Sequence, residues 1–214
     1  MSRAPGRQGE LFEPGSGSDP LDGTTALPLL RHQLVAWQGR LADFQQPLFD
    51  PTRPATDPAG APCREQGWLF PPEFPGQLPG PESLASGFNP LALAPQSLQF
   101  WRWPQPPQGG AAIYVVIDQP PHLQTSLLLY VGETGRAELR WKGEHDCKTY
   151  LSAYAEAMLQ AKLTTRLSIR FWCDVPAAAR SRRALEQALI RRWLPPFNKE
   201  TRQRWATPFT SDPA

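Results

Sequence analysis

Short apolar runs in the second half of the chain predict three β-strands. Ala112 to Ile117 and Leu127 to Val131 are apolar and aromatic runs of strand length. Leu167 to Trp172 alternates Leu, Ile and Phe with Ser, Arg and Trp, which is the period of a strand. Nine residues, including Pro120-Pro121, separate the first two runs. With so short a connection these two strands most simply pair antiparallel.

Apolar residues at helical spacing predict three helices. One covers Leu27 to Phe44, a stretch that contains no proline after Pro28. A second lies in the later part of residues 139–163, and a third runs from about residue 177 to 193, where Pro195-Pro196 ends it. The second half therefore has the order β, β, α, β, α, which predicts an α/β fold in which a small sheet carries helices.

Proline content divides the chain near its middle. Of the 26 prolines, 19 fall in residues 1–108, and proline fixes φ and removes a backbone donor. We expect residues 1–26 to be a disordered tail and residues 27–108 to be a largely irregular, Pro- and aromatic-rich extension with one helix. The aromatic clusters between residues 47 and 107 are expected to dock on the neighbouring domain or, alternatively, to bind a protein partner.

Net charge changes at the same place. Residues 1–108 carry 7 basic and 10 acidic side chains, whereas residues 109–214 carry 15 and 10, so the second half has a net charge of +5 and favours a polyanionic partner. The three cysteines lack metal-ligand spacing and are expected to be reduced thiols. Because no apolar stretch is long enough to cross a bilayer and no secretory signal is evident, we expect a cytoplasmic protein without membrane contact.

Five polar side chains of the second half suit phosphodiester cleavage: Tyr114, Tyr130, Arg140, His145 and Glu186. One carboxylate can hold a divalent cation, a guanidinium can stabilise charge that develops on phosphate, and a phenol or imidazole can transfer a proton. The sequence has no phosphate-binding Gly-rich loop, no Cys or His pair at zinc spacing and no nucleophile elbow.

The same residues also have purely structural interpretations. The two tyrosines could be ordinary strand residues with buried rings, Arg140 a surface arginine, and Glu186 an ion-pair partner of arginines on its own helix. For His145 neither interpretation is favoured. Five arginines of the last helix are expected on a solvated face that could also follow a phosphate backbone: Arg180, Arg182, Arg183, Arg191 and Arg192.

Two tripeptides on the first two predicted strands resemble those that name the GIY-YIG nuclease superfamily: Ala112-Ile113-Tyr114 and Tyr130-Val131-Gly132. Arg140 lies ten residues after Tyr130, where that family has its catalytic arginine. Glu186 matches the family's metal-binding glutamate, and Asn198 matches a terminal asparagine that supports the active site. The resemblance covers about residues 109–200 and leaves 201–214 as a C-terminal tail.

The resemblance implies a central three-stranded antiparallel sheet flanked by helices, and an endonuclease that hydrolyses phosphodiester bonds in DNA. Glu186 would hold a single Mg²⁺ or Mn²⁺, Arg140 would stabilise the phosphate charge, and Tyr114, Tyr130 or His145 would assist the attacking water. Two other classes stay open. The domain could be a catalytically inactive nucleic-acid-binding module, or the chain could act chiefly as an interaction protein through its Pro-rich half.

Three positions depart from the family pattern. Ala112 replaces the first glycine, and His145 follows Arg140 by five residues where the family often has a histidine or tyrosine four residues on. Glu133 stands where some members have lysine. Because a carboxylate there would repel phosphate, we expect Glu133 to face a metal, Arg140 or solvent.

Overall fold

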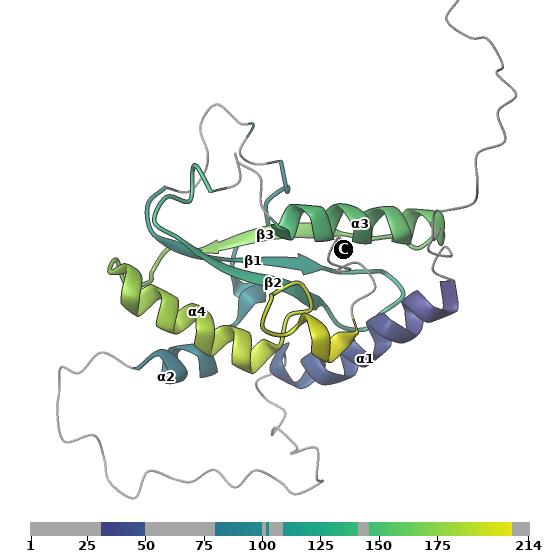
Figure 1. Ribbon diagram of the computed structural model, residues 1–214, viewed down its shortest axis with the longest axis horizontal. Coiled ribbons are helices and arrows are strands. Elements are labelled where there is room, and N and C mark those ends of the chain that lie inside the picture. Colours follow the sequence, from purple (N-terminus) through teal and green to yellow (C-terminus); the bar gives the residue numbers. More distant parts are fainter. Residues whose placement is uncertain (1–30, 50–79, 100–101, 103–108, 141–145, 207–214) are drawn as a thin grey trace, which may run out of the picture.

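The computed structural model describes residues 31–49, 80–99, 102, 109–140 and 146–206 (Figure 1). The predicted tail at residues 1–26 and His145 lie outside these ranges, as does much of the Pro-rich segment between residues 47 and 107.

Three antiparallel strands form the sheet, in the order β2-β1-β3. They are β1 (Ala112–Asp118), β2 (Leu127–Thr134) and β3 (Leu167–Trp172). The predicted strands and the antiparallel pairing of the first two are confirmed. The second strand is longer than predicted, because Glu133 and Thr134 continue the ladder opposite the first residues of β1. As the central strand, β1 is buried along its whole length.

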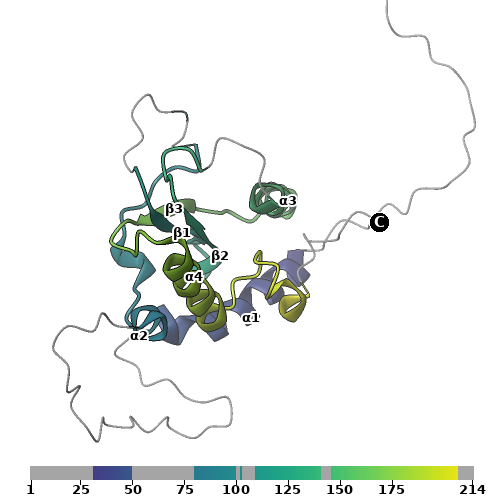
Figure 2. The same ribbon diagram turned by 60° about the vertical axis from the view of Figure 1, so that its left-hand side comes forward.

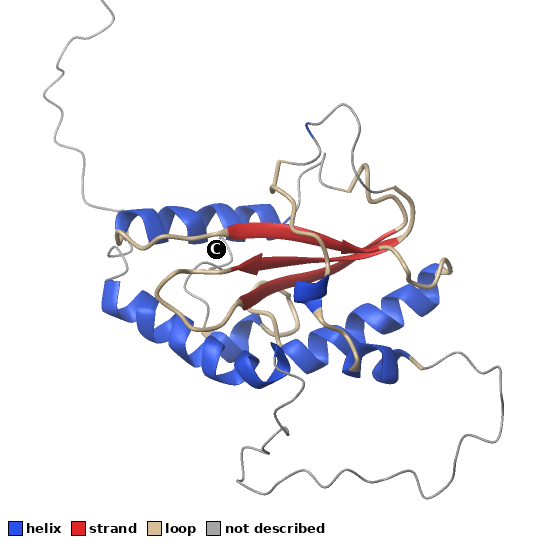
Figure 3. Cartoon of the chain, turned by 180° about the vertical axis from the view of Figure 1, so that it is seen from behind, coloured by secondary structure: helices blue, strands red, loops and turns tan. Residues whose placement is uncertain are grey.

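Helices flank this sheet on both sides, as Figure 3 shows from behind. They are α1 (Arg31–Phe49), α2 (Pro81–Ser86), α3 (Asp146–Gln160) and α4 (Ala179–Trp193), with short 3-10 turns at Pro90–Ala92 (η1) and Arg202–Trp205 (η3). None of the described helices is long and apolar enough to cross a membrane.

The first helix extends beyond its predicted end at Phe44. It continues through Pro47 to Phe49, whose ring packs edge-on against Trp193 at 4.7 Å between centroids. Proline removes one backbone donor and clashes with the preceding turn, which is why the sequence predicted an earlier end. Here Pro47 lies in the last turn, and the aromatic contact stabilises the extra turn.

The sheet has a hydrophobic core on each face. On one face, alternate residues such as Tyr114 and Val116 pack with side chains of α1 and α3. On the other face, Ile113, Val115 and Ile117 pack with α4 and α2. Figure 2 shows α3 and α4 on opposite sides of the strands. The alternation expected of a strand thus builds two cores.

The C-terminal segment also contributes to the first core. Trp205 in η3 is 8% exposed and belongs to the cluster that contains α1 and α3. Its indole Nε1 donates a 2.6 Å hydrogen bond to the carbonyl of Leu194, and the indole of Trp37 donates to the carbonyl of Trp205 at 3.2 Å. The first part of the segment predicted as a tail is therefore docked, and residues 207–214 lie outside the described ranges.

Candidate active site

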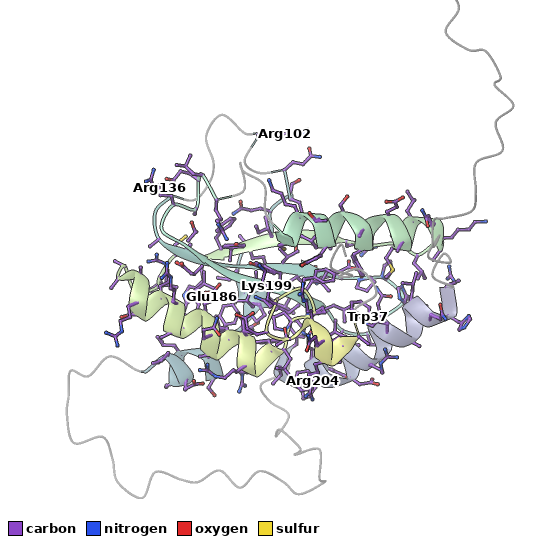
Figure 4. All side chains as sticks on the ribbon, in the orientation of Figure 1. Trp37, Arg102, Arg136, Glu186, Lys199 and Arg204 are labelled. Atoms are coloured by element: carbon purple, nitrogen blue, oxygen red, sulfur yellow. The ribbon has the colours of Figure 1, made fainter. Side chains whose placement is uncertain are left out.

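A pocket of about 400 Å³ opens beside the outer edge of β2. It brings together four of the six residues singled out in the sequence: Tyr130, Arg140, Glu186 and Asn198. Six more residues complete the lining: Tyr150, Gln187, Ile190, Phe197, Lys199 and Glu200. Figure 4 shows Glu186 and Lys199 close together on this side of the molecule, one from α4 and the other from the C-terminal segment.

Tyr114 lies behind the pocket and holds Arg140. Its side chain has no solvent exposure, and its hydroxyl accepts a 2.8 Å hydrogen bond from Nε of Arg140. The guanidinium also lies over the tyrosine ring, 5.6 Å from its centroid. Burial raises the pKa of Tyr114 well above its usual range, against the effect of Arg140. The phenol is therefore a neutral positioning group for the arginine.

Tyr130 lies in the pocket wall next to Tyr114, at 5.9 Å between ring centroids. Burial and the neighbouring Tyr114 phenol raise the pKa of Tyr130 far above neutrality. A phenol in that state donates a hydrogen bond, and it does not accept a proton from water near pH 7.

Gly132 makes room for both tyrosines. A Cβ built on this residue would lie 2.4 Å from Cζ of Tyr114 and 2.8 Å from Cε1 of Tyr130, closer than real side chains approach. Gly132 of the second tripeptide is thus required because the ring of Tyr114, its partner on β1, approaches the backbone too closely for a side chain. Ala112 of the first tripeptide is fully buried, and it is absent from the residues with positive φ, so no glycine is needed there.

Glu186 reaches from α4 to the edge of β2. Its Oε1 accepts a 3.0 Å hydrogen bond from the backbone N–H of Glu133. Burial, followed by the nearby Glu133 carboxylate, raises the pKa of Glu186 to about 7. This carboxyl group therefore changes its charge near neutral pH. The purely structural interpretation was an ion pair between Glu186 and an arginine of its own helix. Among the described residues, the arginines of this helix that form ion pairs do so with Glu133 or Glu82 instead.

Asn198 closes the edge of β2 and supports the pocket wall. Its side-chain amide donates to the carbonyl of Val131 at 2.8 Å and accepts from the N–H of the same residue at 3.0 Å. Gln45 of α1 makes the corresponding pair of bonds with Leu128. These two amides satisfy edge groups that would otherwise be open for pairing with another chain.

Glu133 has different partners from those expected. It forms ion pairs with Arg182 at 2.8 Å and Arg183 at 3.3 Å, and its side chain is 17% exposed. Arg182 is itself buried and also donates to two backbone carbonyls, so its predicted place on a solvated face is wrong. The cause is its position three and seven residues before buried Leu185 and Leu189, on the same helix face.

The sequence interpretation did not single out two polar residues of the pocket, Tyr150 and Lys199. Tyr150, at the start of α3, accepts a 2.9 Å hydrogen bond from Nη1 of Arg202, and Lys199 directly follows Asn198. The sequence predicts the helix that contains Tyr150, but it does not show that this helix lies beside the segment after Asn198.

Among the described residues, no group of three or more His, Cys, Asp or Glu side chains is arranged to hold a metal ion. Comparison of the chain with protein-family models, with curated proteins and with solved structures gave no match. The fold and site define an α/β protein with a polar pocket at a sheet edge.

Proposed function

We propose that the protein is a divalent-metal-dependent endonuclease that hydrolyses phosphodiester bonds in DNA through a GIY-YIG-like domain. The observation that carries this proposal is the convergence of Tyr130, Arg140 and Glu186 on one pocket, with Tyr114 bonded to Arg140. These residues lie on β1, β2, α4 and the turn after β2, so sequence proximity does not explain why all four meet. The positive charge of residues 109–214 supports a polyanionic substrate.

Arg140 is the group assigned to the scissile phosphate. It is about half-buried, lines the pocket, and donates through Nε to the hydroxyl of Tyr114, which is shielded from solvent. A fixed guanidinium aimed at developing phosphate charge lowers the barrier because it needs no reorganisation during the reaction. Tyr130, kept neutral by burial, lines the same pocket, where its hydroxyl would contact the substrate phosphate.

Glu186 is the residue that would hold Mg²⁺ or Mn²⁺. Its carboxylate lines the pocket and is a hard oxygen donor, as Mg²⁺ prefers. Mg²⁺ in phosphoryl-transfer sites commonly relies on one or two carboxylates together with water and substrate phosphates, so one protein carboxylate is compatible with it. When bound, the cation would supply Lewis-acid polarisation of a phosphate oxygen.

A nicking assay tests the proposal. Supercoiled, branched and single-stranded DNA are incubated with the full chain and Mg²⁺ or Mn²⁺, and Glu186→Gln is compared with Glu200→Gln. Both carboxylates line the pocket, but Glu200 is exposed and accepts a hydrogen bond from Gln187. We expect cleavage by the wild type and Glu200→Gln and none by Glu186→Gln. If Glu186→Gln cleaves as fast as Glu200→Gln, the role given to Glu186 is wrong. If the wild type binds DNA without cleaving it, an inactive binding module is favoured.

A further inference from the structure

Basic side chains gather on the segment that follows Asn198, at the rim of the pocket. Lys199 lines the pocket and is exposed. Arg202 donates a hydrogen bond to the hydroxyl of Tyr150, which also lines the pocket, and Arg204 is exposed two residues further on. Figure 4 shows Lys199 beside Glu186 and Arg204 further toward α1 on the same side of the molecule. We name Lys199, Arg202 and Arg204 the basic ledge.

The backbone that carries the ledge is firmly anchored. Thr201 is buried, and its hydroxyl donates to the carbonyl of Pro195. The backbone N–H groups of Thr201 and Arg202 donate to the carbonyl of Asn198 at 3.1 and 3.0 Å. With Trp205 fixed by two indole hydrogen bonds, the ledge has a defined shape, so little ordering entropy is lost when it binds a partner.

Arg204 differs from the ion-paired arginines of α4. Arg182, Arg183 and Arg191 are in ion pairs with carboxylates on β2 or α2. Arg204 instead lies over the ring of Phe44 at 5.8 Å, a contact that leaves its charge unneutralised. Lys199 places an exposed positive charge at the pocket that also contains Arg140, and Arg204 adds a second exposed positive charge further toward α1.

We propose that the basic ledge binds the phosphate backbone of a DNA strand that continues from the phosphate held in the pocket. This inference rests on the proposed function, because it takes the pocket as the place of the scissile phosphate. Contacts from lysine and arginine to phosphate carry no sequence information. The ledge therefore supplies affinity and direction along the strand without base recognition.

Equilibrium binding of a fluorescein-labelled DNA duplex in EDTA, followed by anisotropy over a range of salt concentrations, tests the ledge. Lys199→Gln and Arg204→Gln change exposed side chains and should leave the fold intact, as a thermal melt will check. Each should weaken binding roughly three- to tenfold and lower the slope of log K against log salt by about 0.9. Arg191→Gln removes the same charge from an ion pair with Glu82 and should bind like the wild type.

The outcomes separate this inference from the nuclease activity. If the wild type cleaves DNA but the ledge variants bind with the affinity and slope of Arg191→Gln, the ledge is wrong and the nuclease assignment stands. If the ledge variants lose affinity and slope while the wild type cleaves nothing, the ledge stands and the nuclease assignment falls. A wild type that does not bind the duplex overturns the ledge.

Discussion

Nε of Arg140 donates a 2.8 Å hydrogen bond to the hydroxyl of Tyr114, a residue with no solvent exposure. Arg140 lies in the loop after β2 and Tyr114 in the central strand, so this bond ties a loop side chain to the buried centre of the sheet. A buried tyrosine of the first tripeptide therefore acts on the pocket through the arginine, and Tyr130 of the second tripeptide lines the pocket directly.

Arg140→Lys is expected to impair cleavage much more than binding. Lysine keeps the charge, which supplies most of the attraction to a polyanion, but it has no Nε to meet Tyr114 and no planar fork for two phosphate oxygens. Loss of a donor aimed at transition-state charge costs about 2.7–4 kcal/mol, or roughly a hundredfold to a thousandfold in rate. Single-turnover cleavage with enzyme in excess measures this step alone, and a parental rate there would remove Arg140 from the mechanism.

Gly132→Ala should destabilise the fold and displace Tyr114 from Arg140. The added methyl group would lie 2.4 Å from the tyrosine ring and 2.5 Å from its hydroxyl oxygen, on a fully buried side chain. Overpacking of this kind costs about 1–3 kcal/mol of unfolding free energy. Urea unfolding measures the loss.

Gly39→Ala is the matched control for that substitution. A Cβ at Gly39, within α1, would meet nothing within 4 Å, and alanine in a helix interior is favoured over glycine by about 1 kcal/mol. Gly39→Ala should therefore raise the free energy of unfolding, whereas Gly132→Ala should lower it. If both variants lower it by similar amounts, the contact of the new methyl group with Tyr114 is relieved at little cost.

Periodicity predicted the strands and the main helices because each buries one regular face. It did not predict α2, which has six residues and too few turns to display a period. It also ended α1 too early, because Pro47 favours an earlier end and the contact between Phe49 and Trp193 that stabilises the extra turn joins residues far apart in the chain.

The candidate site was predictable where motif spacing fixed the residues, and less so where tertiary packing decides their partners. Strand alternation places Glu133 on the sheet face opposite Gly132. Which helix covers that face is decided by tertiary packing: α4 crosses β2 there and brings Arg182 to Glu133. Lys199 and Tyr150 meet in the pocket for the same kind of reason.

Asn198→Ala should lower stability through the edge of β2. It leaves the N–H and the carbonyl of Val131 without their amide partner. Each unsatisfied buried polar group costs about 1–3 kcal/mol, so the two groups together are expected to cost roughly 2–6 kcal/mol in chemical unfolding. Asn89→Ala is the control, because that side chain caps η1 through one exposed hydrogen bond and its loss should cost about 1 kcal/mol or less. Equal losses in the two variants would contradict the role given to Asn198.

Glu186→Gln should become more stable than the wild type as pH rises. The folded-state pKa of about 7 lies above the ordinary value of 4.5, so between these pH values the folded state binds more protons than the unfolded state. The stability that protonated Glu186 contributes is then lost as pH rises from about 4.5 to 7, and the loss of this contribution is complete above pH 7. Glutamine resembles the protonated carboxyl, does not ionise, and can still accept the hydrogen bond from the N–H of Glu133.

Thermal melts of both proteins in EDTA measure this effect without any need for activity. The difference in Tm should be near zero at pH 4.5 and should favour Glu186→Gln at pH 8, where the wild type carries a half-buried charge beside the Glu133 carboxylate. Excess Mn²⁺ at pH 8 should then raise the Tm of the wild type alone, because a ligand stabilises only the protein that binds it in the folded state. A Tm difference that does not change with pH would show that burial does not disfavour the charge of Glu186, and an equal effect of Mn²⁺ on both proteins would place the metal elsewhere.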